Sequence, residues 1–292
     1  MSKKIKGTGV ALVTPFHKDG SIDFRSLGKI VQFVIKGGVD FIVPLGTTGE
    51  SVTLTKDEKH AVLDYVTEVN DKRVPLVYGL GGNNTQEIIN CIKHTDFENI
   101  DAILSVSPYY NKPAQRGIYQ HYKIIASASP VPVILYNVPG RTGSNIAPET
   151  TLDLAYDVKN IIAIKEASGN LEQVSRIIKD KPKDFTVLSG DDSLTLPMIA
   201  MGAEGVISVV ANAFPKDFSE LTRKAMEGDY EKSKKLHYKL HDITGLLFAE
   251  GNPAGVKAAL GIMNICEDHL RLPLVGVSKV TYNKIAEAIA AL

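Results

Sequence analysis

The segment Val133-Ile134-Leu135-Tyr136, followed by Ile161-Ile162-Ala163-Ile164-Lys165, decides the fold class of this 292-residue chain. Each is a short apolar run of the kind that forms a buried strand, and a longer stretch with helical spacing separates them. The alternation recurs at intervals of about 20 to 35 residues, which fits repeated strand-plus-helix units. The predicted strands are Val10–Thr14, Phe41–Leu45, Pro75–Gly79, Ala102–Val106, Val133–Tyr136, Ile161–Lys165, Thr186–Ser189 and Gly205–Val209.

Repetition of this unit favours an α/β fold of the (β/α)8 TIM barrel type, which typically takes about 250 residues. A doubly wound open sheet is the alternative. That architecture more often has a glycine-rich phosphate turn after its first strand, and Thr14-Pro15-Phe16-His17 is not such a turn. The sequence therefore predicts a closed barrel.

Helix signals mark the segments between and after the strands. Asp23 can cap a helix that ends at Gly37-Gly38, and Thr55 with Glu58 forms a capping box before Ala61–Val69. We expect the catalytic barrel to occupy residues 1–228, and residues 229–292 to form a C-terminal helical region packed on it. No linker rich in proline, glycine or serine separates the two parts. The helices expected in the second part are Asp229–Leu247, Pro253–Leu260 and Ser278–Leu292.

Composition argues against several classes of protein. The 33 Lys and Arg residues balance the 33 Asp and Glu residues, so no overall positive charge favours nucleic acid or an anionic membrane. No apolar run reaches the roughly 20 residues that span a bilayer. The basic start, residues 1–6, lacks the apolar stretch of a signal peptide, and Cys91 and Cys266 have neither metal-site nor disulfide spacing. We therefore expect a cytoplasmic protein whose partners are small molecules.

Polar residues follow several of the predicted strands. In a barrel of this type the chemistry lies at the C-terminal ends of the strands, so these residues are expected to meet at one face. The polar stretches are Gly46-Thr47-Thr48-Gly49-Glu50-Ser51, Ser107-Pro108-Tyr109-Tyr110-Asn111, Tyr136-Asn137, Pro139-Gly140-Arg141-Thr142-Gly143 and Lys165-Glu166.

Lys165 is the candidate nucleophile among them. Strand alternation places Ile161, Ala163 and Lys165 on one face, which we expect to point into the barrel. Burial disfavours a charged ammonium and frees the amine to attack a carbonyl, as Schiff-base lysines require. An isolated lysine at a strand end more often points into solvent or pairs with a carboxylate, so the interpretation depends on its companions.

The companions supply the other groups that such chemistry needs. Thr47 and Thr48 offer hydroxyl and backbone donors for a carboxylate, Tyr109, Tyr110 and Tyr136 can transfer protons, and Arg141 can bind a second anion. Each also has an ordinary structural interpretation, as a turn, as packing or as a surface residue. Their joint occurrence favours catalysis.

Taken together, these residues resemble the pyruvate-dependent class I aldolases over nearly the whole chain. The resemblance is closest to the branch that condenses pyruvate with L-aspartate 4-semialdehyde, to give 4-hydroxy-tetrahydrodipicolinate in lysine and diaminopimelate biosynthesis. The matching stretches are Gly9–Phe16, Gly46–Ser51, Pro108–Asn111, Tyr136–Pro139, Ile164–Gly169, Ser189–Asp192, Gly205–Ser208, Asn252-Pro253 and Arg271–Pro273.

The resemblance implies a role for each of these residues. Lys165 would form the imine with pyruvate, and a proton relay would run from Tyr136 through Thr48 to Tyr110 of a neighbouring subunit. An active homodimer, and an expected homotetramer, follow from that crossing. Thr47 and Thr48 would hold the pyruvate carboxylate, and Arg141 the carboxylate of the semialdehyde. Gly190 and Ile207 would line the pocket, mainly through backbone groups. No metal and no organic cofactor is expected, since the protonated imine is the electron sink.

Alternative functions remain open at this point. Sibling aldolases, such as N-acetylneuraminate lyases and keto-sugar-acid aldolases, share the barrel and the lysine but usually lack the arginine that matches Arg141. A non-catalytic, ligand-sensing barrel would be expected to have lost the lysine or the tyrosine. His237 and His241 have the spacing of a two-histidine metal site, but Tyr238 breaks the HExxH pattern.

One departure from the resemblance concerns regulation. In lysine-inhibited members of the family, free lysine binds at the subunit interface through residues that match Ser51, Asn83, Glu87 and Tyr109, usually with a histidine near position 56 or 59. This chain has Lys56 and Lys59. A cationic side chain near an ammonium-bearing ligand is unfavourable. The sequence therefore predicts a degenerate site with weak or absent feedback inhibition.

Overall fold

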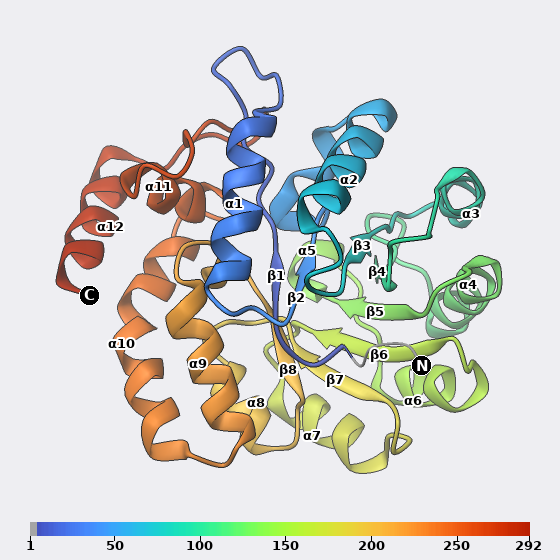
Figure 1. Cartoon of the computed structure of the whole chain (residues 1–292). Coiled ribbons are helices and arrows are strands. Elements are labelled where there is room, and N and C mark those ends of the chain that lie inside the picture. The colour runs from blue at the N-terminus through green and yellow to red at the C-terminus, as the bar shows by residue number, and fades with distance from the viewer. Residues whose placement is uncertain (1–4) are drawn as a thin grey trace.

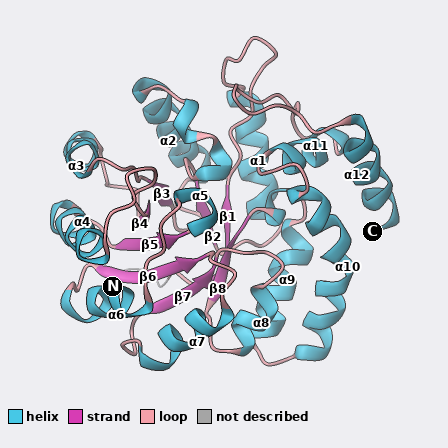
Figure 2. Cartoon of the chain, turned by 180° about the vertical axis from the view of Figure 1, so that it is seen from behind, coloured by secondary structure: helices cyan, strands magenta, loops and turns pink. Residues whose placement is uncertain are grey.

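The computed structural model describes residues 5–292 and contains an eight-stranded parallel barrel ringed by helices (Figure 1). The view from behind shows the strands enclosed by the same ring (Figure 2). The predicted (β/α)8 TIM barrel is confirmed. Its strands are β1 (Gly7–Ala11), β2 (Phe41–Val43), β3 (Val77–Gly79), β4 (Ala102–Val106), β5 (Val133–Asn137), β6 (Ile161–Glu166), β7 (Thr186–Ser189) and β8 (Gly205–Ser208).

Helices follow the strands in the expected alternation. The cap of α1 by Asp23 and the capping box of Thr55 and Glu58 at α2 are both confirmed. The α-helices are α1 (Phe24–Lys36), α2 (Lys56–Asn70), α3 (Thr85–His94), α4 (Gln115–Ala128), α5 (Pro139–Thr142), α6 (Pro148–Asp157), α7 (Leu171–Asp180), α8 (Thr195–Ala200), α9 (Pro215–Met226), α10 (Tyr230–Phe248), α11 (Ala254–Ile262) and α12 (Lys279–Ala291). Short 3-10 turns are η1 (Thr47–Gly49), η2 (Ser51–Thr53) and η3 (Val210–Asn212).

Continuous pairing runs from β2 through β1 and β8 round to β3, and a single bridge between Ile42 and Leu76 brings β2 and β3 together. Close backbone approach at this junction requires a glycine at position 79. A Cβ there would lie 2.6 Å from the backbone nitrogen of Gly46 and from the carbonyl group of Leu45. The loop that starts at Gly46 is therefore held against the end of β3.

The first predicted strand, Val10–Thr14, is wrong at both ends, because β1 spans Gly7–Ala11. Its pairing with β8 begins at Gly7 opposite Gly205, which extends the strand backwards. Beyond Ala11 the chain leaves the ladder, and the backbone N–H of Val13 donates to Oδ1 of Asn212 at 3.1 Å. The predicted ends of Phe41–Leu45, Pro75–Gly79, Val133–Tyr136, Ile161–Lys165 and Gly205–Val209 shift by one or two residues.

Two apolar clusters lie inside and outside the barrel wall. The inner one includes Ala163, Tyr136 and Ile207, and the outer one packs the helices against the strands. Alternation along β6 is broken near its start, since Ile161 belongs to the outer cluster while Ala163 belongs to the inner one. The cause is a register shift between β5 and β6 at Val133/Ile134. The expectation that Ile161 shares a face with Lys165 is therefore wrong, although Lys165 does point inward with Ala163.

Helices α10, α11 and α12 match the three helices expected after residue 228, with ends shifted by one or two residues. Buried apolar residues of these helices, among them Leu247, Leu260 and Ile285, belong to the same outer cluster as the barrel helices. The division of the chain at residue 228 stays a prediction. Within residues 5–292, no helix is long and apolar enough to cross a membrane. Met1 to Lys4, which open the basic start considered in the sequence, lie outside the described residues.

Candidate active site

Lys165 and Tyr136 face each other on adjacent strands at the centre of the site. The parallel pairing of β5 with β6 sets Tyr136 opposite Lys165. Lys165 is only 4% exposed, and its Nζ lies 4.2 Å from the centroid of the Tyr136 ring. An amine held over an aromatic face with little water is positioned to react with a small carbonyl compound.

Gly190, just after β7, leaves the space that the lysine side chain needs. A Cβ at this position would lie 3.0 Å from Cε of Lys165 and 2.6 Å from Cβ of Ala167. The backbone N–H of Gly190 donates to the carbonyl of Glu166 at 2.8 Å, so the turn is tied to the end of β6. A larger residue here would displace Lys165.

Thr47 and Thr48 form the turn η1 that follows β2. The turn is anchored where the Thr14 hydroxyl donates to the Gly49 carbonyl at 2.7 Å. Thr48 is buried, and its Oγ1 accepts a hydrogen bond of 2.9 Å from Nδ2 of Asn252. Thr47 is half-buried.

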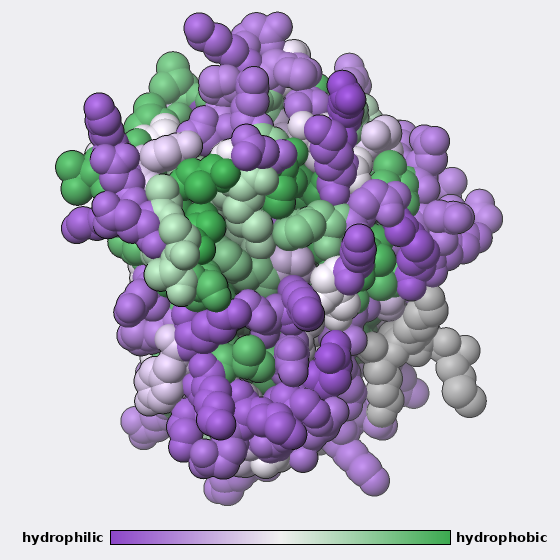
Figure 3. All heavy atoms as spheres, turned by 60° about the vertical axis from the view of Figure 1, so that its left-hand side comes forward, coloured by the Kyte–Doolittle hydropathy of each residue, from purple (hydrophilic) through white to green (hydrophobic). Residues whose placement is uncertain are grey.

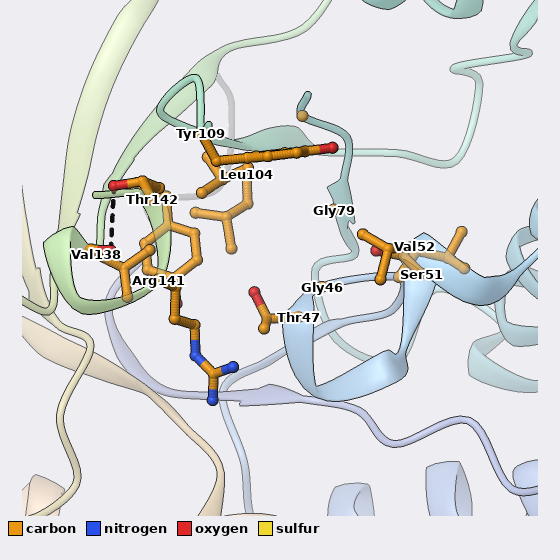
Figure 4. A pocket seen from close by; sticks show the side chains of 14 residues that line it. Gly46, Thr47, Ser51, Val52, Gly79, Leu104, Tyr109, Val138, Arg141 and Thr142 are labelled. Atoms are coloured by element: carbon orange, nitrogen blue, oxygen red, sulfur yellow. Dashed lines mark hydrogen bonds between the residues drawn. The ribbon is translucent and has the colours of Figure 1, made fainter. Parts of the chain in front are cut away.

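Two cavities meet at this end of the barrel. The larger, of about 640 Å³, is lined by Thr48, Lys165, Gly190 and Asn252 among others. The smaller, of about 260 Å³, contains Thr47, Ser51 and Tyr109, which Figure 4 shows around its wall. Tyr136, Val138 and Arg141 line both cavities and so form the wall between them.

Arg141 lies on the short helix α5, which begins at Pro139 directly after β5. Its exposed side chain extends from α5 along the edge of the smaller cavity, with the guanidinium on the side away from Tyr109 (Figure 4). One guanidinium nitrogen lies 3.5 Å from the backbone carbonyl of Asn252. A guanidinium at the mouth of a cavity can bind a carboxylate with two parallel hydrogen bonds.

A buried carboxylate supports the loop that carries Arg141. Glu166, next to the nucleophile, accepts hydrogen bonds from Nδ2 of Asn137 at 3.0 Å and Nε2 of Gln173 at 2.9 Å. It also accepts one from the backbone N–H of Ser168 at 2.7 Å. Oδ1 of Asn137 in turn accepts from the backbone N–H of Ile146. The ends of β5 and β6 are thereby fixed relative to each other.

Asp192 and Ser208 connect the ends of β7 and β8. The Ser208 hydroxyl and the backbone N–H of Val209 donate to the Asp192 carboxyl group. Burial raises the pKa of Asp192 to about 6. Ile207, on β8 beside this contact, is fully buried in the inner cluster and lines neither of the two cavities.

Tyr110 is separated from the other candidate residues of its own chain. Its side chain is 88% exposed and lines neither cavity. The backbone at Tyr110 has a φ of 71°, an uncommon value for a residue with a bulky side chain. This conformation presents the ring to solvent rather than to Thr48 of the same chain.

Several residues of the larger cavity were not assigned from the sequence. They come from the β7–α8 loop and from α10 and its C-terminal flank: Asp191, Ser193, His241, Thr244 and Asn252. Asn252-Pro253 was one of the stretches that match the family, but the sequence assigned no role to Asn252. The ring centroids of His237 and His241 lie 5.9 Å apart. Across the described part of the chain, no group of three or more His, Cys, Asp or Glu side chains could hold a metal ion.

Two of the residues expected to bind regulatory lysine line the smaller cavity. Ser51 and Tyr109 line it, and Nδ2 of Asn83 donates to the Tyr109 carbonyl at 3.1 Å. Glu87 lies in the first turn of α3. Lys56 and Lys59 lie at the start of α2 and do not line the cavity.

Comparison with known proteins places this geometry in a family. The model of the dihydrodipicolinate synthetase family matches residues 4–292. The 4-hydroxy-tetrahydrodipicolinate synthase of Parabacteroides distasonis is 51% identical over 99% of this chain and 97% of its own length.

Solved structures agree with this match. Dihydrodipicolinate synthase from Acinetobacter baumannii, complexed with pyruvate, is 41% identical over 98% of each chain, with a TM-score of 0.95. A structure described as a monomeric dihydrodipicolinate synthase variant is 40% identical over 98% of this chain and 96% of its own, also with a TM-score of 0.95. The barrel with its buried lysine opposite a tyrosine therefore occurs in a chain that resembles these synthases over almost its whole length. The protein belongs to the dihydrodipicolinate synthetase family.

Proposed function

We propose that the protein condenses pyruvate with L-aspartate 4-semialdehyde to give 4-hydroxy-tetrahydrodipicolinate, in lysine and diaminopimelate biosynthesis. The observation that carries this proposal is the buried Lys165 amine, which lies over Tyr136 in a cavity that also contains Arg141. A close relative carries the corresponding name, and another was solved with pyruvate.

The reaction begins when the Lys165 amine attacks the keto carbon of pyruvate. Loss of water from the adduct gives a protonated imine, and loss of a methyl proton gives an enamine. The enamine carbon attacks the aldehyde carbon of the semialdehyde and forms the new carbon–carbon bond. The amino group of the semialdehyde then attacks the imine carbon, closes the ring and displaces Lys165 as the free amine.

Proton transfers in these steps need a group that both accepts and donates. Tyr136 is the nearest candidate, because the Lys165 amine lies against its ring. In the proposed relay, Tyr136 exchanges protons with Thr48, and Thr48 with Tyr110 of the partner subunit. Asn252 also bonds to the Thr48 hydroxyl and so restricts its rotation.

Different residues are proposed to bind the carboxylates of the two substrates. Thr47 and Thr48 lie in a turn whose hydroxyl and backbone N–H groups suit the pyruvate carboxylate. Arg141, in the wall between the cavities, suits the carboxylate of the semialdehyde. Gly190 lines the larger cavity around the proposed imine, and Ile207 is proposed to approach it from the inner apolar cluster. Arg141 also favours the semialdehyde over the sugar-acid substrates of sibling aldolases.

The proposed assembly is a homodimer that pairs into a homotetramer. Tyr110 and Val52, 88% and 78% exposed, are large apolar side chains near the site that a partner could cover. Apolar residues also gather on the face that carries the C-terminal helices (Figure 3). Exposed apolar side chains in that part of the chain include Phe248, Leu274, Val275 and Val280. Surfaces of this kind commonly mark interaction sites.

Borohydride reduction tests the nucleophile. Incubation with pyruvate followed by reduction should leave a stable pyruvate-derived mass on Lys165, found by peptide mass spectrometry. Lys257, which is buried and paired with Glu50, should stay unmodified. The Lys165→Ala variant should give no adduct. An adduct on another lysine in the wild-type protein, or none at all, would show that the imine proposal is wrong.

Removal of Arg141 tests the second substrate. Arg141→Ala should lower kcat/KM for L-aspartate 4-semialdehyde by about 10- to 100-fold, because a charge-assisted hydrogen-bonded pair is worth about 1.5–3 kcal/mol. The pyruvate adduct on Lys165 should still form. Steady-state assays should also find negligible cleavage of N-acetylneuraminate by the wild-type protein. Efficient cleavage would instead favour a sibling aldolase.

Subunit complementation tests the crossing of Tyr110. Tyr110→Phe and Lys165→Ala proteins should each have little activity. When they are unfolded and refolded together, a mixed dimer contains one site with an intact Lys165 and the partner's intact Tyr110. Activity should therefore reappear in the mixture, in proportion to the mixed dimer separated by charge or tag. If Tyr110 acted within its own chain, every site would lack one group and the mixture would stay inactive.

Lysine inhibition tests the regulatory site. Millimolar lysine should leave the steady-state rate nearly unchanged, because Lys56 and Lys59 disfavour an ammonium group nearby. The matched variant Lys56→His/Lys59→His should be more sensitive to lysine than the wild-type protein. Strong inhibition of the wild type at millimolar lysine or below would overturn the expectation.

A further inference from the structure

A buried ion pair connects the loop that carries Thr47 and Thr48 to the C-terminal helix α11. Glu50 directly follows η1 and is 1% exposed, and Lys257 of α11 is fully buried. Nζ of Lys257 lies 2.5 Å from Oε1 of Glu50 and donates to the His269 carbonyl at 2.8 Å. Burial lowers the pKa of Lys257, and the Glu50 charge opposes that shift.

Arg271 fixes the other side of the same carboxylate. Its backbone N–H donates to Oε2 of Glu50 at 3.1 Å, so both carboxylate oxygens have a partner from the C-terminal region. The Arg271 guanidinium donates to the Thr53 carbonyl at 2.9 Å and pairs with Glu58. The segment from Glu50 to the start of α2 is thereby held at three points.

The two cationic groups of this cluster lie against a buried aromatic ring. Phe16, in the β1–α1 loop, is 1% exposed, and its ring centroid lies 4.2 Å from Nζ of Lys257 and 4.6 Å from Cζ of Arg271. Water is excluded from the pair, which strengthens the attraction between Lys257 and Glu50 relative to a surface pair. The contact therefore constrains the Glu50 side chain tightly.

The backbone at Glu50 needs such support. Its φ of 53° and ψ of 33° lie in the left-handed region, which is uncommon for a residue other than glycine. Surrounding contacts must hold a residue in this conformation. Because Glu50 joins η1 to η2, its relaxation would rotate the turn that contains Thr47 and Thr48.

Fold stabilisation alone is a weaker explanation for the pair. Ion pairs buried in a protein interior often stabilise it no better than apolar side chains of similar size. What such a pair imposes is one relative placement of its two elements. Here the elements are the candidate carboxylate-binding turn and α11, and Asn252 from the same C-terminal region also bonds to Thr48.

We propose that the Glu50–Lys257 ion pair, assisted by Arg271, is a positioning device that sets the affinity for pyruvate by fixing the Thr47–Thr48 turn. This inference rests on the proposed function of that turn. Glu50, Lys257 and Arg271 act through the turn and do not contact the substrate. The C-terminal helices thereby take part in binding the first substrate.

Pyruvate titration of variants at the three charged residues tests the proposal. The variants are Glu50→Gln, Lys257→Met, the double variant Glu50→Gln/Lys257→Met and the milder Arg271→Lys. The dissociation constant for pyruvate is measured in the folded protein from the fraction of Lys165 trapped by borohydride at each pyruvate concentration. It should rise by about tenfold or more in the first three variants, because small displacements of binding groups have effects of this order, and by a smaller but measurable factor in Arg271→Lys. Trapping at saturating pyruvate should still approach the wild-type level.

Lys181→Met is the matched control. Lys181 is half-buried at the opposite end of the barrel, where its Nζ lies 3.4 Å from Glu204. This variant should lose thermal stability and keep the wild-type affinity for pyruvate. A purely structural role for Glu50–Lys257 would give the same pattern there, with a lower Tm and an unchanged dissociation constant.

The double variant decides the outcome, because removal of both charges leaves no unpaired ion in the interior. Wild-type affinity for pyruvate in the folded double variant, or in Arg271→Lys if the double variant does not fold, would overturn the inference. Failure of the proposed function gives a different result: the wild-type protein itself would then give no pyruvate adduct on Lys165.

Discussion

The register between β5 and β6 is the constraint on which the site depends. It sets Tyr136 opposite Lys165 and brings the lysine Nζ to 4.2 Å from the tyrosine ring. Lys165 is buried, and its amine lies against the aromatic face where that face borders the larger cavity. The register shift at Val133/Ile134 leaves Ile162 of β6 unpaired just before this point and resets which residues of β6 face inward. Without that shift, the inward residues of β6 would not keep their places opposite β5.

Supporting contacts hold the ends of the neighbouring strands at this face. Glu166 fixes the loop after β5 through Asn137, and Asp192 fixes the end of β8 through Ser208. Gly190 leaves room for the lysine side chain between them. Tyr136, Val138 and Arg141 then divide the space into two cavities. A wall shared in this way allows two small substrates to be recognised by different groups around one reacting carbon.

The C-terminal region, α11 and its flanking loops, extends this arrangement from outside the barrel. Lys257 and Arg271 reach the loop after β2, and Asn252 reaches Thr48. Each contact joins residues about two hundred positions apart in the chain, as between Glu50 and Lys257. The strained backbone at Glu50 persists because these contacts over-determine it. The site is therefore a property of the barrel and the C-terminal helices together.

The sequence by itself determined the repeated strand-and-helix units, the helix caps at Asp23 and Thr55, and the cluster of polar residues that includes Lys165, because these depend on local periodicity and on the order of residues. It misplaced β1 by three residues and assigned Ile161 to the wrong face, since pairing with β8 and the bulge beside β5 are not local. Only the tertiary structure decided that Asn252 and Lys257 reach the loop after β2. The physical reason is that such contacts depend on how the helices pack on the closed barrel, and residue spacing carries no record of that packing.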